Sequence, residues 1–194
     1  MGRKLGLDVD QVIAAAAEIA DRDGLEGLTL ASLASTLGVR SPSLYSHIDG
    51  FAGLRRELAL HSSGVLTAEI KACVEGLDGP EALTAVATQM RSFAKRHPGL
   101  YDSLLPSPSP EEDPRLAGAL AGPVEVVGSI LIAMGVDPQA VIPLIRALRA
   151  SVHGFIDLEN RGGFGLPDDI NASFSITINL AIEAIVNRSV RRGV

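Results

Sequence analysis

Apolar residues recur every three or four positions along most of the chain, and β-branched residues seldom alternate with polar ones. This spacing is typical of amphipathic helices and predicts an all-α protein. Ser-Pro, Gly-Pro and Asp-Pro pairs mark helix starts, because proline loses no hydrogen bond in a first turn. The predicted helices cover residues 9–23, 30–37, 42–47, 51–74, 80–96, a short stretch after Pro98, 114–134 with a break at Gly122-Pro123, 138–160 and 168–188.

The helices fall into two groups by length. Residues 1–50 hold short helices, which cannot stand alone and must pack at steep angles around a small core. Residues 51–194 hold long helices of the kind that form bundles. We therefore predict a three-helix N-terminal domain followed by a larger helical domain.

The stretch "TLASLASTLGVRSPSLYSHI" (29–48) has the spacing of a helix-turn-helix. Thr29 is in the position of an N-cap, and Gly38 is placed where the chain must turn through a conformation that other residues disfavour. Val39 fills the corner. The buried face of the first helix and the anchors of the second follow the helical period: Leu30, Leu33, Ala34 and Leu37, then Leu44 and Ile48.

The outer side of the second helix is polar, with Arg40, Ser41, Ser43, Tyr45, Ser46 and His47. A recognition helix needs hydrogen-bond donors and small side chains for base edges, and flanking groups that hold phosphates. The stretch therefore predicts binding to double-stranded DNA. A solvated helix with an exposed tyrosine is the alternative.

These residues resemble the N-terminal domain of TetR/AcrR-type transcriptional regulators. The similarity rests on Thr29, Leu33-Ala34, Gly38-Val39 and Leu44-Tyr45-Ser46-His47. The resemblance implies contacts to the DNA backbone by Thr29, Ser43, Tyr45 and His47. It implies base reading by Arg40, Ser41 and Pro42.

Two positions depart from the family pattern. Ile48 stands where Phe or Val is usual, and Phe51 replaces a Lys that reaches phosphate in most members. The loss of one phosphate contact is expected to weaken binding without altering sequence preference. Arg55 or Arg56 is a possible substitute, as is an N-terminal arm with Arg3 and Lys4.

The last two helices each have apolar residues on more than one face, so each must be covered twice. We expect a symmetric homodimer that pairs two helices from each chain, with two recognition helices reading a palindrome. The predicted interface residues are Ile145, Leu148, Val152, Phe155, Phe174, Ile178, Ile182 and Ile185. Helix 168–188 has a second apolar side formed by Ile176, Leu180 and Ala184.

"RALRASVHGFIDLENRGGFG" (146–165) resembles the C-terminal domain of a TetR subgroup named for a Trp-His-Gly signature, although the Trp is missing. The resemblance implies an apolar cavity whose small, largely apolar effector changes the spacing of the two DNA-reading helices. The ligand's different affinities for the two states would drive this change. Candidate wall residues are Met90, Phe93, Tyr101, Leu104, Leu105, Ile130 and Met134.

Charge does not by itself indicate a nucleic-acid partner. The net charge is −6, and residues 1–60 carry six Lys and Arg against eight Asp and Glu. Any DNA contact must therefore come from a local arrangement. A helical protein-binding module with the same fold and little DNA affinity is the alternative function.

Other sequence features bear on location and chemistry. Cys73 is the only cysteine, which excludes a disulfide within one chain and favours the cytoplasm. The N-terminus lacks the apolar run of a signal peptide, and no uninterrupted apolar stretch is long enough for a membrane span. Ser43, His47 and Asp49 lack the setting of a catalytic triad, and the remaining histidines are scattered, so we expect no enzyme activity, metal or cofactor.

Overall fold

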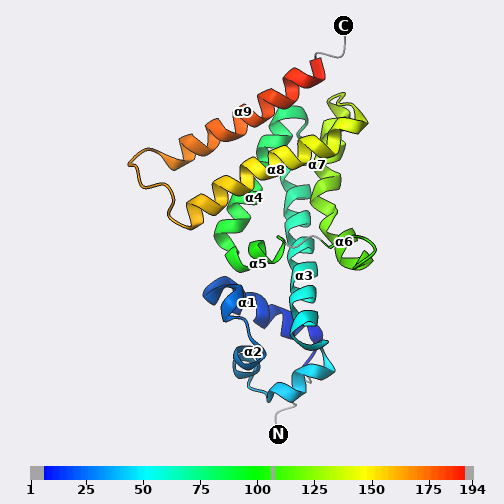
Figure 1. Ribbon diagram of the computed structural model, residues 1–194, viewed down its shortest axis with the longest axis vertical. Coiled ribbons are helices and arrows are strands. Elements are labelled where there is room, and N and C mark those ends of the chain that lie inside the picture. Colours follow the sequence, from blue (N-terminus) through cyan, green and yellow to red (C-terminus); the bar gives the residue numbers. More distant parts are fainter. Residues whose placement is uncertain (1–6, 106–107, 191–194) are drawn as a thin grey trace. The chain divides into compact units, whose positions relative to one another are not determined.

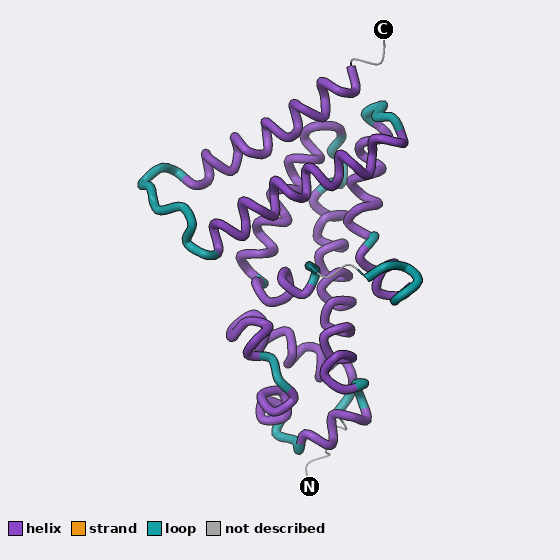
Figure 2. The backbone as a smooth tube through the Cα atoms, viewed as in Figure 1, coloured by secondary structure: helices purple, strands orange, loops and turns teal. Residues whose placement is uncertain are grey.

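The computed structural model describes residues 7–105 and 108–190, and these residues form helices without a β-strand (Figures 1 and 2). This confirms the predicted all-α fold. The elements, in chain order, are α1 (Val9–Gly27), α2 (Leu30–Leu37), the 3₁₀ helix η1 (Ser41–Ser46), α3 (Gly50–Cys73), α4 (Gly79–Arg96), α5 (Pro98–Ser103), α6 (Pro114–Leu120), α7 (Gly122–Ala133), α8 (Pro138–Asn160) and α9 (Ile170–Val190).

The chain divides into two compact units. Unit 1 combines Met1–Val65 with Arg96–Leu120, and unit 2 combines Leu66–Lys95 with Ala121–Val194. Each unit is discontinuous in sequence, so contact density alone does not divide the chain at one position. The functional boundary at residue 50 stays a prediction.

In unit 1, α1 packs closely against α5. A Cβ atom on Gly99 would overlap the backbone of Ala20, so only glycine permits this approach. Asp21 also joins the two helices, because its carboxylate accepts hydrogen bonds from the Leu100 N–H at 3.0 Å and pairs with His97 Nδ1 at 2.8 Å. These contacts tie the start of α5 to α1.

A pair of buried hydroxyls joins α3 to α5 in the same unit. Ser103 Oγ lies 2.8 Å from Ser62 Oγ and 2.6 Å from the carbonyl oxygen of Leu100. Ser62 Oγ donates to the carbonyl oxygen of Leu58 at 2.8 Å. Both serines therefore have hydrogen-bond partners although they are buried.

Two helix boundaries involve glycine residues. The first helix is interrupted where its end was predicted, because Gly24 has non-helical φ and ψ of 76° and 170°, and helical residues resume after this kink as far as Gly27. The predicted break in residues 114–134 is confirmed, since α6 ends at Leu120 and α7 starts at Gly122. A side chain on Gly122 would come within 2.6 Å of Thr67 Oγ1, so α7 approaches α3 closely within unit 2.

In unit 2, α8 and α9 lie antiparallel and side by side (Figure 1). Their contact includes Phe155 and Phe174, whose ring centroids are 5.1 Å apart in a T-shaped arrangement, and Phe164 from the connector packs on Phe155 at 4.7 Å. Arg91 of α4 lies over the rings of Phe155 and Phe174. The three elements therefore share one core.

This packing buries the predicted dimer-interface residues within the single chain, and their role in an interface stays a prediction. All eight residues named for it are at most 7% exposed within the single chain: Ile145, Leu148, Val152, Phe155, Phe174, Ile178, Ile182 and Ile185. The physical reason is that the connector returns α9 along α8, so the larger apolar side of each helix is covered by the chain itself. The opposite side of α9 stays exposed, with Ile176 at 60% and Leu180 at 63%.

One described helix, α9, has the length and apolar composition of a membrane-crossing helix, with a mean hydropathy of 1.2 over Ile170–Asn187. The expectation that no uninterrupted apolar run is long enough for a span concerned a different property, and Asn, Ser, Thr and Glu residues interrupt this window. A helix that buries one side in a protein core and offers a second apolar side to a partner has the same composition.

Candidate nucleic-acid interface

The helix α2 begins at a reciprocal side-chain cap. Thr29 Oγ1 accepts a hydrogen bond from the Ser32 N–H at 3.0 Å, and Ser32 Oγ accepts one from the Thr29 N–H at 2.9 Å. This capping box satisfies two backbone donors that have no partner inside the helix. Both the predicted N-cap and the predicted bounds of α2 are confirmed.

The turn after α2 depends on Gly38, which adopts the left-handed conformation with φ of 65°. The Gly38 N–H donates to the carbonyl oxygen of Ser35 at 3.2 Å, and the Val39 N–H donates to that of Ala34 at 3.0 Å. Residues with a Cβ are disfavoured in this conformation, which is why glycine ends so many helices. The turn directs the chain into η1.

The second helix of the motif differs from the prediction of an α-helix over residues 42–47. It is a 3₁₀ helix over Ser41–Ser46, with Pro42 in its first turn. Ser46 Oγ donates to the Ser43 carbonyl oxygen at 2.8 Å, across the three-residue step of this helix type. The segment is too short to favour α-helical propagation, so the tighter helix forms.

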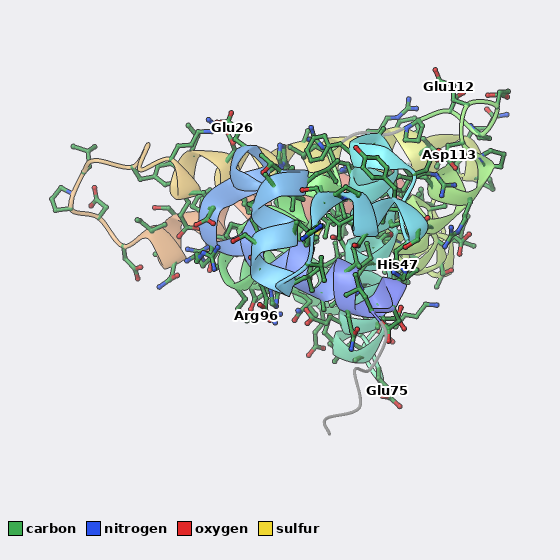
Figure 3. All side chains as sticks on the ribbon, turned by 90° about the horizontal axis from the view of Figure 1, so that it is seen from below. Glu26, His47, Glu75, Arg96, Glu112 and Asp113 are labelled. Atoms are coloured by element: carbon green, nitrogen blue, oxygen red, sulfur yellow. The ribbon has the colours of Figure 1, made fainter. Side chains whose placement is uncertain are left out.

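The 3₁₀ period of three residues separates an inner edge from two outward rows. Leu44 is fully buried on the inner edge, where Ser41 and His47 are half-buried (Figure 3 labels His47). The outward rows pair Pro42 with Tyr45 and Ser43 with Ser46, all exposed. Tyr45 is 60% exposed, the highest exposed fraction among the large apolar side chains of this motif.

The structure therefore brings most of the predicted DNA-contacting residues to one short exposed segment. Thr29, Arg40, Pro42, Ser43 and Tyr45 are exposed. Ser41 and His47, which the α-helical interpretation had placed on the outer side, lie at its edge instead. The role of all seven residues in DNA binding stays a prediction.

The start of α3, beside η1, carries two arginines with different surroundings. Arg56 binds Asp113 through Nε and, at 2.7 Å, through Nη2, and Arg56 Nη1 donates to Glu57 at 3.0 Å. Arg55 is exposed. Arg56 is thus neutralised by two carboxylates, while Arg3 and Lys4 of the expected N-terminal arm lie outside the described residues.

Asp113 also begins α6, because its Oδ1 accepts the Leu116 N–H at 3.0 Å (Figure 3 labels Asp113). The Arg56 guanidinium and then the Leu116 N–H lower the pKa of this carboxyl to about 2. Sequence reasoning missed the pair, since its partners are 57 positions apart. The Asp113-Pro114 pair indicated the start of a helix but not the pairing of Asp113 with Arg56.

The predicted effector-wall residues do not fall in one compact unit. Tyr101, Leu104 and Leu105 belong to unit 1, and Leu105 is exposed; Met90, Phe93, Ile130 and Met134 belong to unit 2. Each unit has a surface hollow, of about 230 Å³ beside Arg56 in unit 1 and about 470 Å³ between α4 and α9 in unit 2. None of the seven residues lines either hollow, and their role stays a prediction.

Acidic, cysteine and histidine side chains do not gather into a metal site. In residues 7–105 and 108–190, no group of three or more of these side chains is placed to hold an ion. Cys73 is half-buried, its Sγ lies 3.2 Å from the Ile70 carbonyl oxygen, and burial raises the pKa of its thiol. A raised pKa keeps the thiol protonated and poorly reactive.

The chain is similar to known transcriptional regulators. A family model described as "Tetracyclin repressor-like, C-terminal domain" matches residues 83–180. The HTH-type transcriptional regulator YobS of Bacillus subtilis (strain 168) is 31% identical over 187 residues, which cover 96% of each chain. The HTH-type transcriptional repressor DrrR1 of Streptomyces coeruleorubidus is 32% identical over 146 residues, 74% of this chain and 51% of that one.

Solved structures share the fold. The transcriptional regulator SCO7222, a TetR from Streptomyces coelicolor, superposes with a TM-score of 0.69 at 24% identity, covering 94% of this chain and 99% of that one. The curated relatives are transcriptional regulators and not enzymes, which confirms the prediction that the chain has no catalytic activity. Matched over residues 83–180 by the family model and over nearly its whole length by the Bacillus regulator, the chain belongs to the TetR family of transcriptional regulators.

Proposed function

We propose that this protein is a ligand-responsive repressor that binds a palindromic DNA operator as a homodimer in the cytoplasm. A small, largely apolar effector releases it from the DNA. Thr29, Arg40, Ser41, Pro42, Ser43, Tyr45 and His47 form the proposed DNA-contacting set.

The observation that carries the proposal is the two-sided character of η1. Leu44 is fully buried and fixes the segment, while the adjacent Tyr45 is 60% exposed beside Ser43. An exposed tyrosine side chain forgoes the free energy that burial of its ring would provide. A partner that accepts a hydrogen bond from its hydroxyl explains this exposure. Phosphate oxygens are such acceptors, and they set the position of a protein on a duplex.

The exposed side of α9 supports the homodimer. Ala172, Ile176, Leu180 and Ala184 recur every four residues and are all exposed in the single chain. Two copies related by a two-fold axis would cover these stripes with each other. Two copies of η1 would then read the two halves of a palindrome.

Repression and release by an effector are supported by the relatives alone. DrrR1 is described as a transcriptional repressor, and the matching family model is described as tetracycline repressor-like. An effector would act by binding more tightly to the state that cannot engage both half-sites. Met90, Phe93, Tyr101, Leu104, Leu105, Ile130 and Met134 remain the candidates for contacting it.

Selection of bound duplexes from a random pool tests the proposal. We expect a palindromic sequence, and we expect the double variant Ser43→Ala, Tyr45→Ala to lose retardation of that duplex. Thr88→Ala is the matched control, since Thr88 is an exposed hydroxyl residue on α4 of unit 2. No enrichment, or binding that does not fall as salt rises, would favour the protein-binding module instead.

A further inference from the structure

The acidic balance of the chain makes each available cation near η1 important. Three arginines of unit 1 are already paired with carboxylates: Arg22 with Asp23, Arg56 with Asp113 and Glu57, and Arg115 with Glu57. Arg40 and Arg55 form no ion pair with a described residue of the chain. Both flank η1, one at its N-cap and the other on the second turn of α3.

Arg55 lies within cation–π distance of Phe51. The guanidinium carbon of Arg55 lies 5.9 Å from the centroid of the Phe51 ring, one helical turn earlier. Side chains on an α-helix lean towards its N-terminus, so the guanidinium is directed back towards the end of α3 that follows η1. The Phe51 side chain is 37% exposed, whereas a phenylalanine that only packs in a core is usually buried.

The contact with the Phe51 ring leaves the guanidinium of Arg55 available to bind an anion. The ring attracts the cation through its electron-rich face but carries no charge, so the contact does not neutralise the guanidinium or supply a carboxylate to its N–H donors. A contact with the ring also favours some rotamers of the long side chain over others, so less conformational entropy is lost when a ligand binds. A phosphate oxygen is the anion that a duplex seated on η1 would place there.

Arg56, the next residue, has none of these properties. Its three donor nitrogens are directed at the carboxylates of Asp113 and Glu57 within unit 1. Its charge is neutralised and its side chain is only 32% exposed. Two adjacent arginines therefore divide into one that holds α3 to α6 and one that is available.

We propose that Arg55 binds a DNA phosphate and that Phe51 is the positioning residue that presents its guanidinium. The proposal rests on the proposed DNA-binding function. It adds to the interface a cation outside η1, together with the aromatic ring that orients it.

Salt dependence of binding to the selected duplex tests the role of Arg55. A cation that displaces one counterion contributes about 0.9 to the slope of log K against log salt, or roughly an eightfold change in affinity for a tenfold change in salt. We expect Arg55→Ala to lower the slope by about one per half-site, with unchanged sequence preference. Arg22→Ala removes the same charge from an exposed site on α1 and is the matched control.

The role of Phe51 needs variants that separate the ring from its apolar bulk. Phe51→Leu keeps apolar volume but removes the ring, and we expect affinity to fall about two- to fivefold with the salt slope retained. Phe51→Tyr keeps the ring and is expected to bind like the wild type. Thermal unfolding of each variant should match the wild type, because both side chains are exposed.

The outcomes distinguish this inference from the function on which it rests. A wild-type protein without salt-dependent DNA binding would overturn both. A wild-type protein that binds, with Arg55→Ala no different from Arg22→Ala, would overturn the role of Arg55 alone. Equal affinities for Phe51→Leu and Phe51→Tyr would overturn the positioning role of the ring.

Discussion

Arg91 of α4 donates two hydrogen bonds to Glu159 of α8, from Nε at 2.7 Å and from Nη2 at 2.5 Å. Lys95 Nζ is 2.8 Å from the same carboxylate, and Arg91 Nη1 donates to Asn171 of α9 at 3.0 Å. The guanidinium also lies 4.6 Å from the ring centroid of Phe174. One largely buried charge cluster thus joins three helices of unit 2, and it depends on Glu159 for its negative charge.

Removal of that negative charge is expected to destabilise unit 2. Glu159→Gln keeps the shape of the side chain but leaves Arg91 in a mostly buried site without a counter-charge. Breaking a buried ion pair lowers the free energy of unfolding by about 3 kcal/mol. The solvent that reaches Lys95 offsets part of this loss. Urea unfolding measures the change.

Asp157→Asn is the matched control on the same helix, because Asp157 pairs with Arg161 at the surface. Its effect should stay within about 0.5 kcal/mol. Equal losses of unfolding free energy in the two variants would show that the cluster around Arg91 stabilises unit 2 no more than a surface ion pair does.

Acid is expected to weaken the fold through two carboxyls. Arg91, followed by Lys95, lowers the pKa of Glu159 from 4.5 to about 2, and Arg56 lowers that of Asp113 from 3.8 to about 2. Both pKa values are lower in the folded state, so the unfolded chain takes up protons first as the pH falls. The stabilisation is complete above about pH 5 and is lost progressively towards pH 2.

A melting temperature measured across this pH range tests the prediction. The wild type should lose stability steeply between about pH 5 and pH 2, and Glu159→Gln should show a shallower slope because one of the two titrating groups is absent. Parallel curves for the two proteins would show that Glu159 does not titrate with folding.

Two glycine substitutions in unit 1 should have opposite effects. Gly99→Ala would place a methyl group on the backbone of Ala20, forcing α5 away from α1 at a cost of about 3 kcal/mol. Gly118 in α6 has no atom within 4 Å of the added Cβ, so Gly118→Ala should stabilise by about 0.5 to 1 kcal/mol. Thermal unfolding of both variants gives the comparison, and equal shifts would contradict the close contact.

The proposed homodimer predicts a difference between two exposed leucines. Leu180 lies on the exposed stripe of α9 and Leu166 in the connector, with exposures of 63% and 78%. Leu180→Arg would place a charge in the interface and is expected to give a monomer at micromolar concentration, whereas Leu166→Arg should stay dimeric. Light scattering after gel filtration measures both masses. A wild-type monomer would refute the homodimer itself.

Local signals predicted α2 and the turn that follows it well. Thr29 and Gly38 define α2 because a cap and a left-handed turn act on neighbouring backbone groups, and both were readable from residue type. The helix type of η1 was not readable, since α and 3₁₀ turns of six residues share the same composition. That difference moved Ser41 and His47 from the outer side to its edge.

Contacts between distant segments account for the features that the sequence pattern did not predict. Helix α9 has two apolar sides, and the sequence pattern does not tell which one the chain covers by itself and which one is left for a partner. The structure covers the side of Ile178 and leaves that of Leu180 exposed. The pairing of Arg56 with Asp113 is equally invisible, because it depends on how distant segments meet.

The hydroxyl pair of Ser62 and Ser103 has a consequence for how α3 and α5 move. The bond between Ser103 and Ser62 forms in only one alignment of the two helices, whereas each serine also has an acceptor in its own helix, the Leu58 carbonyl for Ser62 and the Leu100 carbonyl for Ser103. A displacement would break the one hydrogen bond between the helices, at a cost of about 1 kcal/mol, and would leave each hydroxyl bonded within its own helix. The pair therefore favours one alignment of α3 and α5 while allowing the helices to shift without stranding a buried hydroxyl.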